Sequence, residues 1–234
     1  MHCAFSGDGQ RTIVYLHGWG ADGRCFAPVA ACLPEFYNVM PDLNGFSKSP
    51  SPPQEGWNVA DYAEQVRLLC AQYNIQRATF VCHSFGCRVA LCLASAYPEL
   101  CDGLLLYAAA GLRRFSPLRT LRVAVYKGRK SFRRLLGLPV KPSGSADYLA
   151  TADNLKSTFV KVVNTDLSAC ARRVRCPVLL LNGNADKVTP PSHARRLCRL
   201  LPRGNLRLLD GDHFSLFYTP SVFAKIVQEF VSEQ

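Results

Sequence analysis

A candidate nucleophile, Ser84, lies where an apolar run changes into a helical pattern. Residues Ala78 to Cys82 are typical of a buried strand, and the residues after Ser84 have the spacing of a helix that ends near Pro98. A sharp strand-to-helix turn at Ser84 would lift its hydroxyl above the sheet edge, and the small Gly86 fits such a crowded turn. A serine placed in this way can attack a carbonyl carbon if a nearby base removes its proton.

Of the five histidines in the chain, His213 is the best candidate for that base. It follows the last apolar strand run, so we expect it at the carboxyl edge of the sheet, where open α/β sheets bind ligands. Asp186 follows the preceding strand run and supplies an acid to orient the imidazole ring. Asp212 is the competing acid, but a residue adjacent to His213 cannot easily reach its ring nitrogen. Ser84, Asp186 and His213 are therefore the predicted catalytic residues.

These motifs make the chain similar to the α/β-hydrolase superfamily, especially its small esterase-like members with a helical cap. The resemblance covers nearly the whole chain, and the order nucleophile, acid, histidine is that of the family. The run Leu16 to Gly20 (Leu-His-Gly-Trp-Gly) resembles the oxyanion loop of the family, and Asp42 to Ser49 resembles the loop after its next strand. The resemblance implies that the main-chain N–H groups of Trp19 and Phe85 form an oxyanion hole.

One departure from the family pattern concerns the nucleophile turn. The first glycine of the family's G-x-S-x-G motif is Cys82 here, and a further common glycine is Cys87. Because cysteine is small, we expect the turn to form with Cys82 in place. Cys82 itself is not expected to be the nucleophile, because it lies within the strand.

The pattern of apolar residues predicts the fold class. Continuous apolar strands indicate a sheet that is buried on both faces, hence a parallel sheet covered by helices. Their alternation with helical patterns predicts a doubly wound, mostly parallel sheet, which the resemblance extends to an α/β-hydrolase fold with a short helical cap insertion. The six predicted strands are Ile13–Leu16, Tyr37–Met40, Ala78–Cys82, Leu104–Tyr107, Val178–Leu181 and Leu206–Leu209.

A long gap between two predicted strands holds an insertion. We expect a core domain made of residues 1–112 and 167–234, and a helical cap over residues 113–166. Ten Lys or Arg residues and no Asp or Glu lie between Arg113 and Lys141, within a chain of net charge +11. This stretch is typical of a solvated cap helix, and the alternative is a docking surface for an acidic partner, such as an acyl carrier protein, or for an anionic surface. No recognition motif for nucleic acid accompanies the charge.

Four residues are candidates for the substrate pocket. Leu155 and Phe159 belong to a second cap segment that is expected to line an acyl pocket, and Phe214 follows the candidate base. His17 precedes Gly18 in the oxyanion-like loop, although a structural role for His17 is the more economical interpretation. We give His83 the same structural interpretation.

The composition suits a single globular domain of 234 residues. The first ten residues lack a signal-peptide pattern, and no apolar stretch is long enough to span a bilayer, so we expect a cytoplasmic protein. The eleven cysteines form no C-x-x-C pair and no zinc-ligand spacing, which predicts reduced thiols and no metal or cofactor.

The sequence thus predicts a serine hydrolase that cleaves a small or acyl-chain carboxylic ester or thioester through an acyl-enzyme. Three alternatives remain open at this stage. The same triad could serve carbon–carbon bond hydrolysis, although Phe214 stands where those enzymes usually have tryptophan. It could also serve acyl transfer, or the fold could be used for binding alone.

Overall fold

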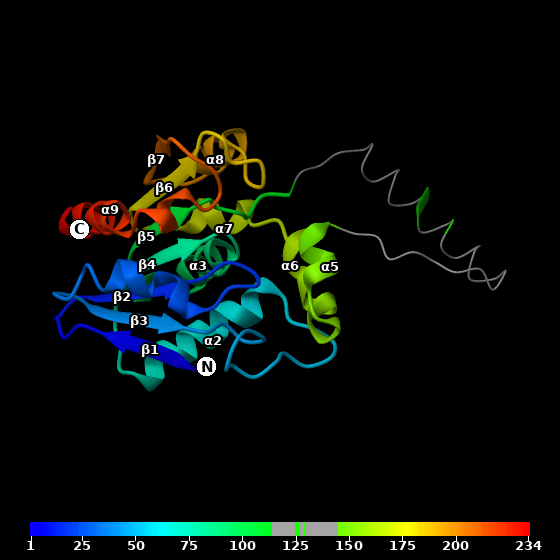
Figure 1. The fold of residues 1–234 in the computed structure, drawn as a ribbon, viewed down its shortest axis with the longest axis horizontal. Helices are drawn as coiled ribbons and strands as arrows, with labels where there is room; N and C mark the ends of the chain where they lie inside the picture. The colour runs from blue at the N-terminus through cyan, green and yellow to red at the C-terminus, as the bar shows by residue number, and fades with distance from the viewer. Residues whose placement is uncertain (114–124, 127–128, 130–144) are drawn as a thin grey trace.

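The computed structural model describes residues 1–113, 125–126, 129 and 145–234. Within these residues, a seven-stranded sheet with the strand order β1-β3-β2-β4-β5-β6-β7 forms the centre of the molecule (Figure 1). All neighbouring strands are parallel except β1, which pairs antiparallel with β3. The strands are β1 (Cys3–Ser6), β2 (Thr12–Leu16), β3 (Tyr37–Pro41), β4 (Ala78–His83), β5 (Cys101–Tyr107), β6 (Val178–Gly183) and β7 (Gly204–Leu209).

The apolar runs form strands because both of their faces are buried. In β2, Ile13 and Tyr15 join the core on one side of the sheet, whereas Val14 and Leu16 join the core on the other side. Side chains of a strand alternate between the two faces, so a continuous apolar run satisfies two cores at once. The predicted doubly wound, mostly parallel α/β sheet is confirmed.

The first strand, β1, was not predicted from the sequence. Its four residues are partly exposed at the edge of the sheet, and the short segment carries no long apolar run. The segment is ordered by its partner β3 and by His2, whose Nδ1 lies 2.9 Å from Asp42 Oδ2. The N-terminal residues are therefore part of the sheet.

Helices cover both faces of the sheet. α1 and α9 pack on one face, and α2, α3, α7 and α8 pack on the other. The helices are α1 (Ala27–Ala30), α2 (Val59–Gln72), α3 (Phe85–Ala96), α5 (Ala146–Ala150), α6 (Lys156–Asn164), α7 (Ser168–Arg173), α8 (Pro191–Cys198) and α9 (Pro220–Ser232). Short 3-10 helices are η1 (Gly23–Phe26), η2 (Pro98–Leu100), η3 (Asp153–Leu155) and η4 (Ser215–Tyr218).

Local sequence explains where the larger helices begin. The N-cap residue of α2, Asn58, accepts hydrogen bonds from the N–H groups of Ala60 and Asp61, and Asp61 in turn accepts one from the N–H of Asn58. This reciprocal capping box satisfies donors that a helix start leaves unpaired. Pro191 and Pro220 open α8 and α9, where a missing N–H costs nothing.

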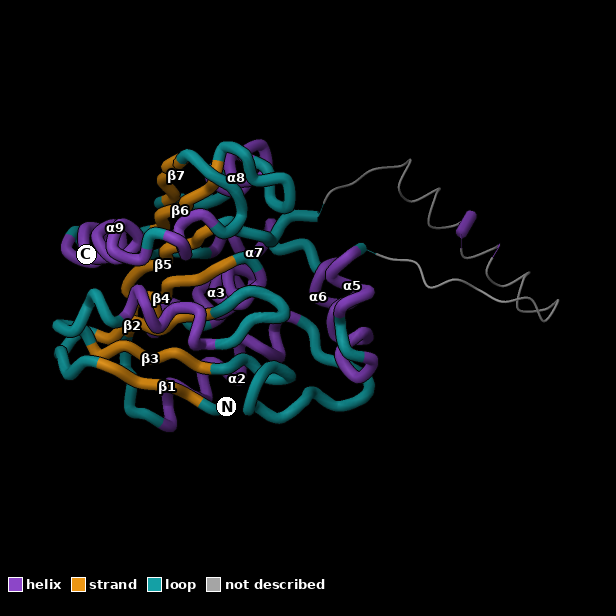
Figure 2. Tube along the Cα trace, in the orientation of Figure 1, coloured by secondary structure: helices purple, strands orange, loops and turns teal. Residues whose placement is uncertain are grey.

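The helices α5 and α6 lie at the edge of the sheet where the loops after β2 and β3 emerge (Figure 2). Side chains tie the end of this segment to the core. Lys161 Nζ donates to the carbonyl oxygen of Gly56 over 2.7 Å. The buried Arg88 of α3 donates from Nη1 to the carbonyl oxygens of Val162 and Thr165, each over 3.0 Å. Most of the predicted basic stretch 113–141 lies outside the described residues.

All eleven cysteines are free thiols in the structure. In the part of the chain that the structure describes, no helix is long and apolar enough to cross a membrane.

A clash test at Gly86 probes the packing that supports the start of α3. A Cβ at Gly86 would lie 2.0 Å from the main-chain oxygen of Leu16, so Gly86→Ala must push α3 away from β2. We expect Gly86→Ala to lower the free energy of unfolding by about 3 kcal/mol, as overpacked cores do. The measurement is urea unfolding followed by circular dichroism.

The matched control is Gly111→Ala. The nearest atom to its added Cβ would be Cδ1 in the movable side chain of Leu91, at 3.2 Å, and Leu167 would be in ordinary contact at 3.9 Å. We expect a change below about 1 kcal/mol there. Equal stability of the two variants would contradict the packing argument.

Candidate active site

Ser84 occupies a strained turn between β4 and α3. Its backbone has φ 47° and ψ −100°, a conformation that a residue with a side chain adopts only when its surroundings enforce it. The N–H of Ser84 donates to the carbonyl oxygen of Tyr107 over 3.0 Å, which ties the turn to β5. The turn forms with Cys82 inside the strand, where complete burial raises the pKa of its thiol well above the ordinary value. Cys82 is therefore a neutral core residue.

His213 and Asp186 form a buried hydrogen-bonded pair. His213 Nδ1 lies 2.8 Å from Asp186 Oδ2, and only 7% of the His213 side chain and none of the Asp186 side chain is exposed. Since a carboxylate only accepts, Nδ1 is the protonated ring nitrogen and Nε2 carries the lone pair. The lone pair on His213 Nε2 is therefore directed away from Asp186 and can accept a proton.

The carboxylate of Asp186 is held by its own loop. Its Oδ1 accepts from the N–H groups of Val188 and Thr189, each over 2.8 Å, and its Oδ2 also accepts from the Thr189 hydroxyl over 2.8 Å. Burial opposes ionisation, but the hydrogen bonds from His213 and Thr189 outweigh it, and the pKa of Asp186 lies below its ordinary value. The Asp186 carboxyl group is therefore ionised at neutral pH and accepts the hydrogen bond from the His213 ring.

Asp212, the competing acid, does not contact the His213 ring among the described residues. Its Oδ1 instead accepts from the N–H of Phe214 and from the hydroxyl of Ser215, each over 2.9 Å. Asp212 therefore shapes the loop that carries His213.

His83 joins the nucleophile turn to the loop of the candidate base. His83 Nε2 donates to the main-chain oxygen of His213 over 3.1 Å, and the two rings lie 4.8 Å apart. Burial, together with the neighbouring His213, lowers the pKa of His83 to about 3, so the ring is neutral. Among the described residues, no hydrogen bond joins Ser84 to His213. The contact between the residue next to Ser84 and the His213 loop places both at one edge of the sheet.

The two predicted oxyanion donors lie on either side of this turn. Phe85 is the first residue of α3, where an N–H has no partner within the helix. The loop of Trp19 approaches the turn closely, because a Cβ on Gly18 would lie 3.6 Å from the Ser84 Cβ. No hydrogen bond within the described residues uses the main-chain N–H of Trp19. Both N–H groups are thus available close to Ser84.

The Trp19 side chain fills an aromatic cluster beside the site. Its ring centroid lies 5.0 Å from that of Phe46, 5.2 Å from that of Phe85 and 5.1 Å from that of Phe159. Its indole Nε1 donates to Thr151 Oγ1 over 3.0 Å. The ring therefore lies between the start of α3 and the helix α6.

The four predicted pocket residues differ in burial and in their neighbours. Phe159 belongs to the Trp19 cluster, and Leu155 is buried against Gly45. Phe214 is 49% exposed, and its ring lies 4.9 Å from that of His213. His17 is completely buried, with Nδ1 bonded to the carbonyl oxygen of Gly18 and Nε2 accepting from the N–H of Leu43. This placement argues against a pocket role for His17 and favours a structural one.

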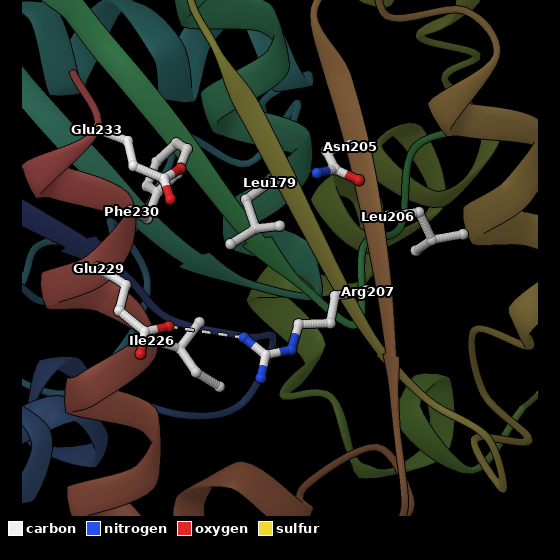
Figure 3. A pocket seen from close by; sticks show the side chains of 8 residues that line it. All are labelled: Leu179, Asn205, Leu206, Arg207, Ile226, Glu229, Phe230 and Glu233. Carbon is white, nitrogen blue, oxygen red and sulfur yellow. Dashed lines mark ion pairs between the residues drawn. The ribbon is translucent and has the colours of Figure 1, made fainter.

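A separate cavity of about 310 Å³ lies between β6, β7 and α9 (Figure 3). Arg207 and Glu229 face each other across it at 3.7 Å. Its strand residues are Leu179 of β6 and Asn205, Leu206 and Arg207 of β7, none of which lies at the carboxyl end of its strand, whereas Ser84, Asp186 and His213 follow the carboxyl ends of their strands. This cavity is therefore distinct from the candidate active site. Within the described residues, no group of three or more His, Cys, Asp or Glu side chains could hold a metal ion.

Comparisons with known proteins identify the family of the chain. Residues 11–155, more than half of the chain, match the family described as the alpha/beta hydrolase fold. The chain belongs to the α/β hydrolase family. A putative carbamate hydrolase, RutD, of Pseudomonas syringae is 27% identical over 249 residues, which cover 95% of this chain and 94% of that protein. The magnesium-chelatase 30 kDa subunit of Rhodobacter capsulatus is 27% identical over 231 residues, covering 86% and 80%.

Solved structures share the same fold. The enol-lactonase of Burkholderia xenovorans superimposes with a TM-score of 0.78 at 20% identity and covers 99% of this chain and 96% of its own. An esterase of Thermogutta terrifontis has a TM-score of 0.77 at 17% identity, with 99% and 93% covered. These neighbours show the fold, and the family match with the related hydrolase supports a hydrolase.

Several contacts of this α/β hydrolase escaped the sequence analysis. Thr189 follows Asp186 by three residues, a spacing at which a side chain can close a local turn, so this contact had a weak signal. The hydrogen bonds of Trp19 with Thr151 and of His83 with the His213 carbonyl join residues 132 and 130 positions apart, and no local pattern predicts them.

The buried neutral ring of His83 predicts a pH dependence of stability. The ordinary pKa of histidine is about 6.5, so between roughly pH 6.5 and pH 3 the unfolded chain binds a proton at this position and the folded chain does not. The His83 contribution to stability is therefore complete above this window and is lost as the pH falls through it, by up to about 1.4 kcal/mol per pH unit. We expect His83→Gln, which keeps an N–H donor, to remove this share of the slope.

The measurement is urea unfolding of both proteins between roughly pH 4 and pH 7. The other titrating groups are common to both proteins and cancel in the difference. Identical slopes would show that His83 is protonated in the folded state.

Proposed function

We propose that this α/β hydrolase cleaves carboxylic esters or thioesters through an acyl-enzyme on Ser84. The observation that carries the proposal is the buried pair of His213 and Asp186 on the same sheet edge as the strained turn of Ser84. A nucleophile, a base with a free lone pair and a fixed acid are the parts that acyl transfer needs.

The first half-reaction acylates the serine. As substrate binds, His213 Nε2 accepts the Ser84 hydroxyl proton while Oγ bonds to the carbonyl carbon. Negative charge develops on the carbonyl oxygen, where the N–H groups of Trp19 and Phe85 would stabilise it. The C–O or C–S bond then breaks, and His213 passes its proton to the leaving alcohol or thiol.

The second half-reaction consumes water. His213 takes a proton from a water molecule whose oxygen attacks the acyl carbon, and it returns that proton to Ser84 Oγ as the acid leaves. Asp186 stays ionised throughout and stabilises the imidazolium form of His213 in each step. The hydrogen bond between His213 and Asp186 is already formed without substrate, so these two side chains need little reorganisation during the reaction.

The acyl side of the substrate is expected to be apolar. Trp19 packs against Phe159 and against Phe85, the residue after Ser84. Leu155 belongs to the apolar core cluster against which Trp19 packs. Phe214, half-exposed beside His213, stays a predicted contact for the substrate. The related RutD proteins are named as putative carbamate hydrolases, and a carbamate carbonyl is attacked by the same steps, so carbamates belong in the substrate panel.

An acidic partner for the basic stretch stays a prediction. Arg113 is described, but the ten basic residues lie mostly outside the described part of the chain. If an acyl carrier protein docks there, its binding should weaken as salt rises.

Removing the nucleophile tests the proposal directly. We expect Ser84→Ala to reduce ester hydrolysis by about 10⁶-fold and to abolish labelling by a fluorophosphonate probe. The matched control is Ser192→Ala, an exposed serine in α8, which should keep both properties. Rates are measured on p-nitrophenyl esters, thioesters, carbamates and vinylogous diketones.

Three outcomes would contradict the proposal. Hydrolysis by folded Ser84→Ala at the wild-type rate removes Ser84 as the nucleophile. A folded wild-type protein that neither labels nor turns over any substrate favours a binding protein. Turnover of the diketones alone favours carbon–carbon bond hydrolysis.

Trp19 is expected to limit the length of the acyl chain. Because its ring fills the space between Phe85 and Phe159, Trp19→Ala should raise kcat/KM for long-chain relative to short-chain p-nitrophenyl esters by about tenfold. Trp57→Ala is the control, since that ring packs on Tyr62 and not on the cluster. An unchanged chain-length profile in Trp19→Ala would place the acyl pocket elsewhere.

A further inference from the structure

Two helices present a pair of cysteines to each other on the face of the sheet that carries α3. α3 and α7 pack together, and each contributes two side chains three residues apart, which is the spacing of one helix face. α3 supplies Cys92 and Ser95, and α7 supplies Cys170 and Arg173. The four side chains form one cluster, the α3–α7 thiol site, apart from the residues used for the proposed function.

The contacts within the α3–α7 thiol site converge on Cys170. Cys92 and Cys170 lie beside each other, close enough for each thiol to shift the pKa of the other. Arg173 Nη2 lies 3.9 Å from Cys170 Sγ, and Arg173 Nε donates to Ser95 Oγ over 2.9 Å, which fixes the guanidinium beside the sulfur. Both cysteines are only partly buried, so a small solute can reach them.

The surroundings shift the pKa values of the two thiols in opposite directions. The neighbouring Cys92 thiol, together with hydrogen bonds from Ser95 and Arg173, outweighs burial and lowers the pKa of Cys170 to about 6. The neighbouring Cys170 and burial raise the pKa of Cys92. Elsewhere in the chain, burial raises the pKa of Cys101 and Cys176. A thiolate stabilised by a cation and next to a protonated thiol is the arrangement found at redox-active cysteines.

We propose that Cys170 is an oxidation site for peroxides and that Cys92 resolves the oxidised form into a disulfide. The Cys170 thiolate attacks one oxygen of hydrogen peroxide, the O–O bond breaks, and hydroxide leaves and is protonated to water. Cys170 is then a sulfenic acid. Cys92 gives up its proton and attacks the Cys170 sulfur, and the sulfenic oxygen departs as a second water. Two thiols and one peroxide thus yield one disulfide and two waters.

The disulfide would bind α7 covalently to the helix that begins next to Ser84. Cysteine oxidation at this site does not depend on the proposed ester hydrolysis, because it uses none of the residues assigned to that reaction.

The test is oxidation of the full chain with hydrogen peroxide, alkylation of the remaining thiols and peptide mass spectrometry. We expect a peptide pair joined through Cys92 and Cys170 before any other cysteine reacts. Cys170→Ser should abolish the crosslink, and Cys92→Ser should leave a sulfenic acid on Cys170 that dimedone traps. The matched control is Cys32→Ser, an exposed cysteine outside the site, which should leave the crosslink intact.

A second measurement isolates Arg173. We expect Arg173→Gln to slow iodoacetamide alkylation of Cys170 about tenfold near neutral pH and not at alkaline pH, where Cys170 is ionised with or without Arg173. A merely structural effect would slow both. The proposal is overturned if Cys32 or another cysteine is oxidised while Cys92 and Cys170 still alkylate, or if Arg173→Gln leaves the neutral rate unchanged.

Discussion

The left-handed backbone of Ser84 is the constraint on which the rest of the candidate site depends. Such a conformation costs on the order of 1–3 kcal/mol for a residue with a side chain, so the surrounding structure must enforce it. The enforcement comes from both sides of the turn. β4 is hydrogen-bonded within the middle of the sheet, and Gly86 lets α3 approach the Leu16 carbonyl more closely than any side chain allows. The centre of the sheet therefore positions the proposed nucleophile.

A buried carboxylate is a second constraint, and the fold meets it locally. An ion without partners in the interior is strongly unfavourable, and four hydrogen bonds to Asp186 offset that cost. Three of them come from Val188 and Thr189 in its own loop, so most of the contacts that fix the Asp186 side chain are independent of His213. His213 is fixed separately through its main-chain oxygen by His83. Acid, base and nucleophile are thus each held by different contacts that meet at one edge of the sheet.

The sequence predicted the parts of this arrangement that depend on local pattern. Ser84, Asp186 and His213 were found because each follows an apolar strand run, and parallel strands bring such positions to one edge. β1 was missed because a short edge strand is specified by its partner β3 and carries little signal of its own. The proximity of Cys92 to Cys170 and of Trp19 to Thr151 results from helix and loop packing across the fold. Such contacts depend on three-dimensional distances that spacing along the chain does not encode.

The attachment of residues 145–166 to the core has a consequence for how substrates are distinguished. Trp19 holds this segment near its beginning through Thr151, the main-chain N–H of Trp57 holds it beyond its middle through Thr158, and Arg88 holds its end. If this segment lines the proposed acyl pocket, its three attachments would make it a stationary wall, and a ligand would have to match a contour that exists before it binds. Selection by a preformed surface spends no binding energy on ordering the protein, and it leaves little room for a poorly fitting molecule to remodel its surroundings.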